Sequence, residues 1–164
     1  MKTRSTFQLF SSCAFATLML MLSITAWAHG DVTPQAVDTS TLPSLGSDWK
    51  RGNPYRGNET AIKVGTSAYN QNCARCHGLE AISGGIAPDL RKLDNECSTQ
   101  KDKIKQASCL QEMDEYFAGK FRRGVTRNGA VYMPPFEGIL NQEAAWSIKS
   151  YLETRREKPL VATQ

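Results

Sequence analysis

Neither sign of charge dominates this chain of 164 residues, in which 20 basic side chains face 16 acidic ones for a formal charge of +4. A nucleic-acid-binding protein needs a marked basic excess, so that class is excluded. The sequence also lacks internal repeats, low-complexity tracts and a βαβ pattern. It shows no grouping of nucleophile, base and orienting residue, so catalysis by its own side chains is not predicted.

No acidic residue occurs in the first 28 positions. This segment opens with Lys2 and Arg4, continues through an apolar stretch over 15–24 and ends in the A-x-A pattern Ala26-Trp27-Ala28. Such a layout is typical of a cleaved secretory signal peptide, and the apolar stretch is too short for a membrane anchor. We therefore predict an exported protein from which residues 1–28 are removed.

Five cysteines are present; Cys13 leaves with the signal peptide, and two lie in the run Cys73-Ala74-Arg75-Cys76-His77. This C-x-x-C-H pattern is the signature of c-type haem attachment. Two thiols three residues apart can add to the two vinyl groups of one porphyrin edge, and the adjacent imidazole is then held at the iron. A bare C-x-x-C would also fit a thioredoxin-like redox motif or a zinc site, but the fused histidine argues against both. We predict one haem c, covalent through Cys73 and Cys76, with His77 as an iron ligand.

The remaining cysteines, Cys97 and Cys109, are an even pair in an exported chain. An oxidising compartment favours a disulfide between them, which would close a short charged loop. The alternatives are half of a zinc site, for which too few spare histidines exist, and two free thiols.

The second iron ligand is predicted by elimination. After signal removal the histidines are His29, at the new N-terminus, and His77, while the methionines are Met113 and Met133. Met113 falls on the apolar face of a predicted helix, whereas Met133 precedes two prolines that stiffen its loop. A rigid loop can hold a thioether against an iron, so we predict Met133 as the ligand rather than as a filler of a packing gap.

Ligation by His77 and Met133 bears on the class of function. A thioether ligand favours the ferrous iron and occupies the position that a substrate or gas would need. We therefore predict an electron carrier and not an enzyme. The alternative from another class is a haem enzyme or gas sensor with a displaceable Met133.

Three helices are predicted, over about 60–73, 109–123 and 142–156. In the second, apolar residues recur at three- and four-residue steps, and in the third Asn141 is a natural N-cap. Gly65 offers the first helix a point of close approach. No convincing strand pattern interrupts these helices, so the fold class is all-α, with long loops wrapped around the cofactor.

Two further patterns have open interpretations. The run Gly84-Gly85-Ile86-Ala87-Pro88-Asp89-Leu90 lets backbone approach the haem and offers a carbonyl to the Nδ1 proton of His77, or it is an ordinary turn. A basic cluster precedes the Met133 loop and either steers an acidic partner or is a solvated helix end. Its members are Lys120, Arg122, Arg123 and Arg127.

The segment from Ala61 to Leu152 resembles the class I c-type cytochromes in the order of its C-x-x-C-H motif, Pro88-x-Leu90 and Met133-Pro134. The resemblance implies the class I cytochrome c fold and a Pro88 carbonyl that binds His77. It also implies that the first and last helices cross near Gly65, Tyr69 and Tyr151. The resulting domain boundaries are a signal peptide over 1–28, an irregular arm over 29–60 anchored by Trp49 and Tyr55, a cytochrome domain over 61–157 and a tail over 158–164.

Nearly the whole mature chain is similar to the periplasmic c-550 cytochromes of quinoprotein ethanol oxidation, through runs such as His29 to Pro34, Asn53 to Arg56 and Tyr132 to Gly138. This resemblance implies a periplasmic location, an electron donor that is an alcohol dehydrogenase dependent on pyrroloquinoline quinone, and a terminal oxidase or another cytochrome as acceptor. The expected protein is a monomer. A methanol dehydrogenase or another periplasmic dehydrogenase is the alternative donor.

Overall fold

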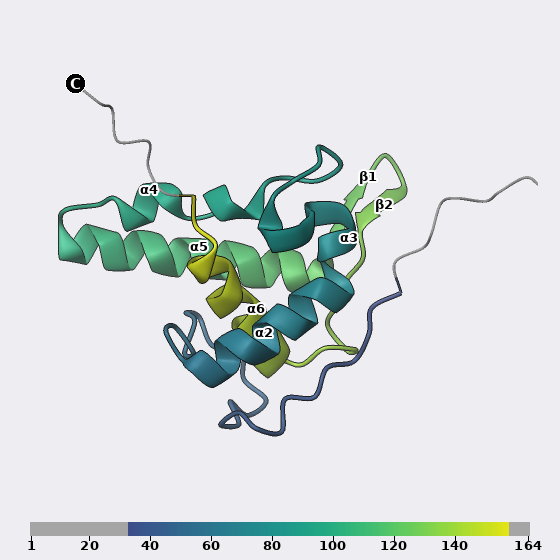
Figure 1. Cartoon of the computed structure of the whole chain (residues 1–164), viewed down its shortest axis with the longest axis horizontal. Coiled ribbons are helices and arrows are strands. Elements are labelled where there is room, and N and C mark those ends of the chain that lie inside the picture. Colours follow the sequence, from purple (N-terminus) through teal and green to yellow (C-terminus); the bar gives the residue numbers. More distant parts are fainter. Residues whose placement is uncertain (1–32, 158–164) are drawn as a thin grey trace, which may run out of the picture. The chain divides into compact units, whose positions relative to one another are not determined.

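Helices make up most of the regular structure in the computed structural model, which describes residues 33–157 (Figure 1). The predicted all-α class is confirmed, with one small hairpin as the exception. The predicted signal peptide and C-terminal tail lie outside the described residues. Within 33–157, no helix combines the length and the apolar character needed to cross a bilayer. In chain order the elements are α2 (Glu59–Asn72), α3 (Ala74–His77), the 3-10 turns η1 (Leu79–Ala81) and η2 (Leu90–Lys92), α4 (Asn95–Ser98), α5 (Lys103–Arg123), β1 (Val125–Arg127), β2 (Ala130–Met133) and α6 (Gln142–Thr154).

Helices α2 and α6 cross at close range, and this crossing organises the core. A Cβ on Gly65 would lie 1.9 Å from the backbone oxygen of Ser147, so only glycine allows the two backbones to meet there. One turn later the rings of Tyr69 and Tyr151 pack with centroids 5.1 Å apart. The predicted crossing at these residues is confirmed.

Side-chain caps begin both crossing helices. The side chain of Asn58 accepts a hydrogen bond from the backbone N–H of Ala61, and Asn141, as predicted, accepts one from Ala144. Each cap satisfies a donor that the first helical turn leaves free. The core that these helices bury contains Ala68, Tyr69, Ala81, Phe121, Phe136, Leu140, Ala144, Ala145, Ile148, Tyr151 and Leu152.

Helix α5 begins six residues before the predicted start at Cys109. Its first turn is capped by Asp102, whose side chain accepts hydrogen bonds from the backbone N–H groups of Ile104 and Lys105. The prediction relied on apolar periodicity, which starts only at Leu110. Most of the residues before it are polar, and the apolar Ile104 is exposed and stands alone, so periodicity could not reveal them.

The same polar segment is tied down by a disulfide between Cys97 of α4 and Cys109 of α5, with Cα atoms 5.4 Å apart. The predicted pairing is confirmed, and the alternatives of a zinc half-site and two free thiols are wrong. The bond joins α4, a helix of only four residues, to the first half of α5.

A β-hairpin follows α5, which the prediction of no strands missed. Its strands pair antiparallel, and the turn residues Asn128 and Gly129 both have positive φ, of 51° and 77°. An Asn-Gly pair is the strongest short sequence signal for such a turn. The strands are short and exposed, so they carried no alternating pattern that would have indicated them.

The arm before α2 has no helix or strand in its described part, and Trp49 and Tyr55 anchor it as predicted. Tyr55 is buried and its hydroxyl donates to the carbonyl of Pro43. The Trp49 ring packs against Phe121 and Trp146, at centroid distances of 6.2 and 6.4 Å. These contacts hold the arm against α5 and α6.

Candidate functional site

One helical turn presents the three residues of the C-x-x-C-H motif on the same face. Helix α2 ends at Asn72, and the N–H groups of Cys76 and His77 both donate to the carbonyl of Cys73, at 3.1 and 2.9 Å. Residues three and four positions apart are neighbours on a helix surface. Cys73 and Cys76 form no disulfide, and both residues are half-buried. The motif therefore offers two sulfurs and one imidazole side by side.

Cys73 as a whole is half-buried, but its sulfur is densely surrounded by other atoms. This burial, followed by the neighbouring Cys76, raises the pKa of the Cys73 thiol to about 12. The group is therefore present as the thiol and not as the thiolate at neutral pH.

The imidazole of His77 is held by the backbone of the following loop. Its Nδ1 lies 2.9 Å from the carbonyl oxygen of Pro88. A carbonyl oxygen only accepts, so Nδ1 carries the proton and Nε2 keeps the lone pair that a metal requires. The resemblance to class I cytochromes implies this contact between His77 and Pro88. That the two residues take part in binding haem stays a prediction.

The loop that carries Pro88 is shaped by local hydrogen bonds. The hydroxyl of Ser83 donates to the carbonyl of Ala87 and accepts from the N–H of Gly85 at 3.0 Å. Gly85 has a φ of 98°, so this position needs glycine. No described atom lies within 4 Å of where a Cβ on Gly84 or Gly85 would be. That these glycines approach a haem remains a prediction.

Met133 lies at the end of β2, where the hairpin returns to the core. A bulge shifts the register so that Val125 pairs with Met133 and Thr126 with Val131. The additional residue, Tyr132, is 67% exposed, whereas Met133 packs against the core. A bulge of this kind redirects a side chain, and here it turns the methionine inward.

The backbone after Met133 is pressed against the end of α5. A Cβ on Gly124, whose φ is 65°, would lie 2.2 Å from the backbone oxygen of Met133. Phe136 donates its N–H to the carbonyl of Phe121 at 3.0 Å, and the two rings stack with centroids 5.2 Å apart. Glycine and stacked rings thus fix the loop that the two prolines stiffen.

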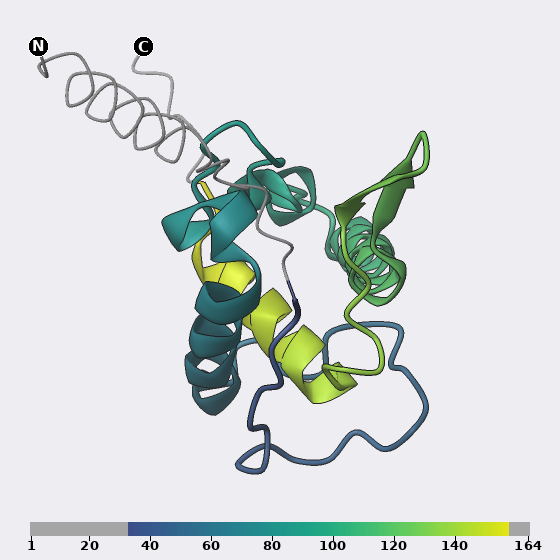
Figure 2. The same ribbon diagram turned by 90° about the vertical axis from the view of Figure 1, so that its right-hand side faces the viewer.

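Cys73, Leu90 and Met133 all pack against the same core cluster, although they come from three separate segments. Figure 2 shows the hairpin, in light green, on the side of α5 and away from the turn that carries the C-x-x-C-H motif. The donors available are an imidazole nitrogen with its proton fixed on the other nitrogen, a thioether sulfur and two free thiols. This set suits a covalently attached haem with one nitrogen and one sulfur ligand.

The basic cluster before the Met133 loop is largely engaged in local contacts. Arg122 pairs with Glu137 at 2.8 Å and lies over the ring of Trp49, and Arg127 lies over the ring of Tyr132. These local contacts favour the interpretation of a solvated helix end over that of a cluster that steers an acidic partner.

Three acidic residues lie buried around one cation and not on a solvated face. Asp94, Asp114 and Glu153 surround the ammonium group of Lys149, at 2.7, 3.3 and 2.8 Å. The Lys149 side chain is 1% exposed. The sequence did carry a signal for this buried charge. Lys149 lies four residues after Ala145 and three before Leu152, so it occupies a core-facing position of α6, where a charged residue is unusual.

Two arginines complete this charge network of six residues. Arg56 contacts Asp114 and Glu153, and Arg156 contacts Asp94. Burial of Asp94 acts to raise its pKa, but the hydrogen bonds from Arg156 and the charge of Lys149 outweigh that effect and lower it to about 2. The network therefore carries three positive and three negative charges between the arm, the Asp94 loop, α5 and α6.

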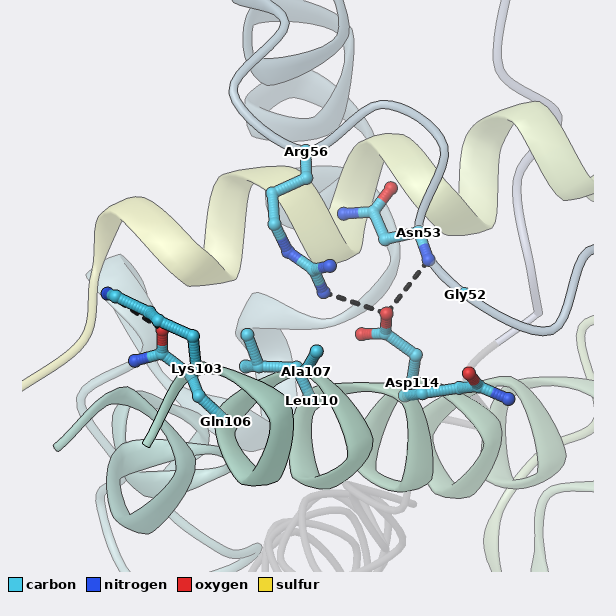
Figure 3. A pocket seen from close by; sticks show the side chains of 9 residues that line it. Gly52, Asn53, Arg56, Lys103, Gln106, Ala107, Leu110 and Asp114 are labelled. Carbon is cyan, nitrogen blue, oxygen red and sulfur yellow. Dashed lines mark hydrogen bonds and ion pairs between the residues drawn. The ribbon is translucent and has the colours of Figure 1, made fainter. Parts of the chain in front are cut away.

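A groove of about 310 Å³ lies beside this network, between the arm and the first half of α5 (Figure 3). Figure 3 shows Asp114 on its wall, bonded to the guanidinium of Arg56 and the backbone N–H of Asn53. None of the predicted haem-binding residues lines it. A second groove lies beside the disulfide and is lined by Met113, which is half-buried there rather than in the main core.

Comparisons with known proteins show the family of the chain. Residues 60–152 match the family model described as "Cytochrome C oxidase, cbb3-type, subunit III". The chain is 51% identical to "Cytochrome c550" of Pseudomonas aeruginosa over 139 residues, which cover 82% of this chain and 86% of that protein. No solved structure matches the chain significantly.

Shorter similarities connect the chain to two larger proteins of Pseudomonas putida. A segment of 44 residues, 26% of this chain and 6% of the relative, is 50% identical to "Quinohemoprotein alcohol dehydrogenase ADH-IIG". A segment of 101 residues, 62% of this chain and 12% of the relative, is 27% identical to "Quinohemoprotein alcohol dehydrogenase ADH IIB". With its C-x-x-C-H turn and its helical fold, the chain belongs to the cytochrome c family and is an electron carrier, not an enzyme, with covalently bound haem c.

Proposed function

We propose that this cytochrome works in the periplasm, where it accepts electrons from an alcohol dehydrogenase dependent on pyrroloquinoline quinone, with ethanol as the substrate class. It passes them towards a terminal oxidase or another cytochrome. The similarity to cytochrome c550 over most of both chains supports a separate carrier rather than a domain of a larger enzyme. The 50% identity to part of a quinohaemoprotein alcohol dehydrogenase supports the donor. The pattern of a signal peptide over 1–28 supports the location.

Within this proposal, His77 and Met133 are the two iron ligands, and Cys73 and Cys76 bind the porphyrin covalently. Haem c, when bound, supplies an iron that takes up and releases one electron. The carbonyl of Pro88 holds the proton on Nδ1 of His77, at 2.9 Å, and so keeps Nε2 directed to its ligand role. Met133 is held by the bulge and by the close approach at Gly124. A ligand pair held this firmly changes little between oxidation states, which suits rapid electron transfer.

The hydrogen bond from His77 to Pro88, with Met133 turned towards the same core, is the observation that carries the ligand assignment. Its test is Met133→Ala in the holoprotein. We expect the absorption band from sulfur-to-iron charge transfer in the ferric protein to disappear. Met113→Ala, which removes a methionine beside the disulfide, should leave the band intact and serves as the matched control. A band that persists in Met133→Ala rejects the assignment.

The donor is tested separately by stopped-flow reduction. A purified quinoprotein ethanol dehydrogenase should reduce the ferric cytochrome faster than a methanol dehydrogenase at equal concentration and ionic strength. Equal rates, or a faster reaction with the methanol enzyme, would contradict the proposed donor while leaving the haem ligation untouched.

A further inference from the structure

Tyr69 makes hydrogen bonds at both ends of the haem-attachment turn. Its backbone carbonyl accepts from the N–H of Cys73 at 2.8 Å, where the turn begins. Its hydroxyl donates to the carbonyl of Gly78 at 2.7 Å, directly after His77. A single residue of α2 thus brackets the five residues that carry both cysteines and the histidine.

Packing alone does not account for the hydroxyl of Tyr69. Its ring is fully buried and packs against Tyr151, with the ring planes tilted by 43°, at the crossing of α2 and α6, which a phenylalanine would do equally well. A buried hydroxyl without a partner would be costly, so its position against the Gly78 carbonyl is specific. Burial, and then the nearby Cys73 and Tyr151, raise the pKa of Tyr69, and the group therefore stays protonated as a donor.

The conformation of Gly78 supplies the matching acceptor. Gly78 has φ 80° and ψ 161°, and a Cβ there would lie 1.9 Å from the backbone oxygen of Ile82. Only glycine fits this reversal, which ends α3 and turns the Gly78 carbonyl back towards α2. The chain therefore leaves His77 in a fixed direction, and the Tyr69 hydroxyl is the side-chain contact that holds it.

We propose that Tyr69 is a positioning residue for His77, acting through the Gly78 carbonyl. The imidazole of His77 is then held at two points, its ring by the Pro88 carbonyl and its backbone by Tyr69. The inference rests on the proposed role of His77 as an iron ligand. Loss of the hydroxyl frees the end of the turn and lets the imidazole tilt.

The test compares Tyr69→Phe with Tyr151→Phe in the reduced holoprotein. Both variants keep the packed pair of rings and lose one hydroxyl. Within residues 33–157, the Tyr151 hydroxyl makes no hydrogen bond to the turn from Cys73 to Gly78, so this variant is the matched control. The measurements are hydrogen exchange of the His77 ring proton and of the Gly78 amide by NMR, and the reduction potential.

In Tyr69→Phe we expect exchange at both positions to accelerate about five- to tenfold, the factor expected for loss of one hydrogen bond, together with a shift in the reduction potential. Tyr151→Phe should leave both quantities near the wild-type values. Wild-type exchange and potential in Tyr69→Phe, or equal changes in the two variants, would overturn the proposal.

A second measurement covers the case in which Tyr69→Phe does not retain haem. In the wild-type holoprotein, the Tyr69 hydroxyl proton should exchange slowly and show a nuclear Overhauser effect to the Gly78 α-protons. A missing effect, with the Met133 band intact, would overturn the role of Tyr69 and leave the haem ligation standing. Loss of the band in the wild type would instead reject the ligation itself.

Discussion

Replacing Lys149 with methionine should destabilise the protein strongly, because its ammonium group is the centre of the buried charge network. The group lies 2.7 Å from Asp94, 2.8 Å from Glu153 and 3.3 Å from Asp114, and its side chain is 1% exposed. Methionine matches the shape of the lysine stem but carries no charge. The variant therefore leaves three buried carboxylates with only two arginines as partners.

The expected loss of stability depends on the ion pairs that remain in the variant. Breaking a buried ion pair by removing one partner costs about 3–5 kcal/mol. Arg56 still contacts Asp114 at 2.7 Å and Arg156 still contacts Asp94, so charge compensation is partial. We expect the free energy of unfolding of Lys149→Met to fall by about 3 kcal/mol at pH 7.

The loss should also depend on pH in a defined direction. Without Lys149, one of the causes that lower the pKa values of Asp94 and Glu153 is absent, so these carboxyl groups take up protons at higher pH than in the wild type. Protonation removes the uncompensated charge, and the difference between variant and wild type should shrink by about 1 kcal/mol between pH 7 and pH 4.

Guanidinium unfolding of the two holoproteins, followed by circular dichroism at both pH values, measures these differences. The matched control is Lys92→Met, since Lys92 pairs with Glu157 at 3.6 Å on the surface and its side chain is 60% exposed. An exposed pair of this kind contributes at most about 1 kcal/mol. A loss in Lys149→Met no larger than in the control, or one that is the same at both pH values, would refute the reasoning.

Three further predictions follow from the packing, the disulfide and the acid titration. Gly65→Ala should lower the free energy of unfolding by at least about 2 kcal/mol, because its Cβ would lie 1.9 Å from backbone of α6, whereas Gly84→Ala has open space; equal melting temperatures of the two variants would contradict the close crossing. Replacing Cys97 and Cys109 with serine should cost about 3 kcal/mol in urea unfolding, since the bond closes a short loop, and alkylation of either sulfur before reduction would argue against the bond. Burial of Asp94 acts to raise its pKa, but the two cations that contact it outweigh burial and lower the pKa from 3.8 to about 2. The ionised Asp94 therefore adds about 2 kcal/mol to the free energy of unfolding above pH 4, and this stabilisation is lost as the pH falls from about 4 to about 2. In Asp94→Asn the free energy of unfolding should change less with pH over this acid range than in the wild type. An unchanged pH dependence would count against this role of Asp94.

Much of this protein was predictable from short-range signals. The C-x-x-C-H run indicates its chemistry, because both thiols and the imidazole belong to one helical turn. Asn141 indicated the start of α6, because a cap acts within the first helical turn. Gly65 by itself indicated only a point of close approach, and the resemblance to class I cytochromes supplied the last helix as its partner. The Cys97–Cys109 bond followed from counting cysteines in an exported chain. The hairpin had a local signal too, the pair Asn128-Gly129, which was overlooked.

Other features arise only where distant segments meet. Whether Asp94 is solvated or buried depends on Lys149, which is 55 residues away in sequence, and no local pattern specifies that contact. The inward turn of Met133 depends on a bulge against β1, and the Tyr69–Gly78 bond depends on the backbone reversal after α3. The sequence by itself determined the cofactor class, the approximate places of the three long helices and the covalent links, because these follow from residues close together in the chain. Tertiary structure decided which charges are buried and how the two predicted iron ligands are held, because both depend on packing between segments far apart in the chain.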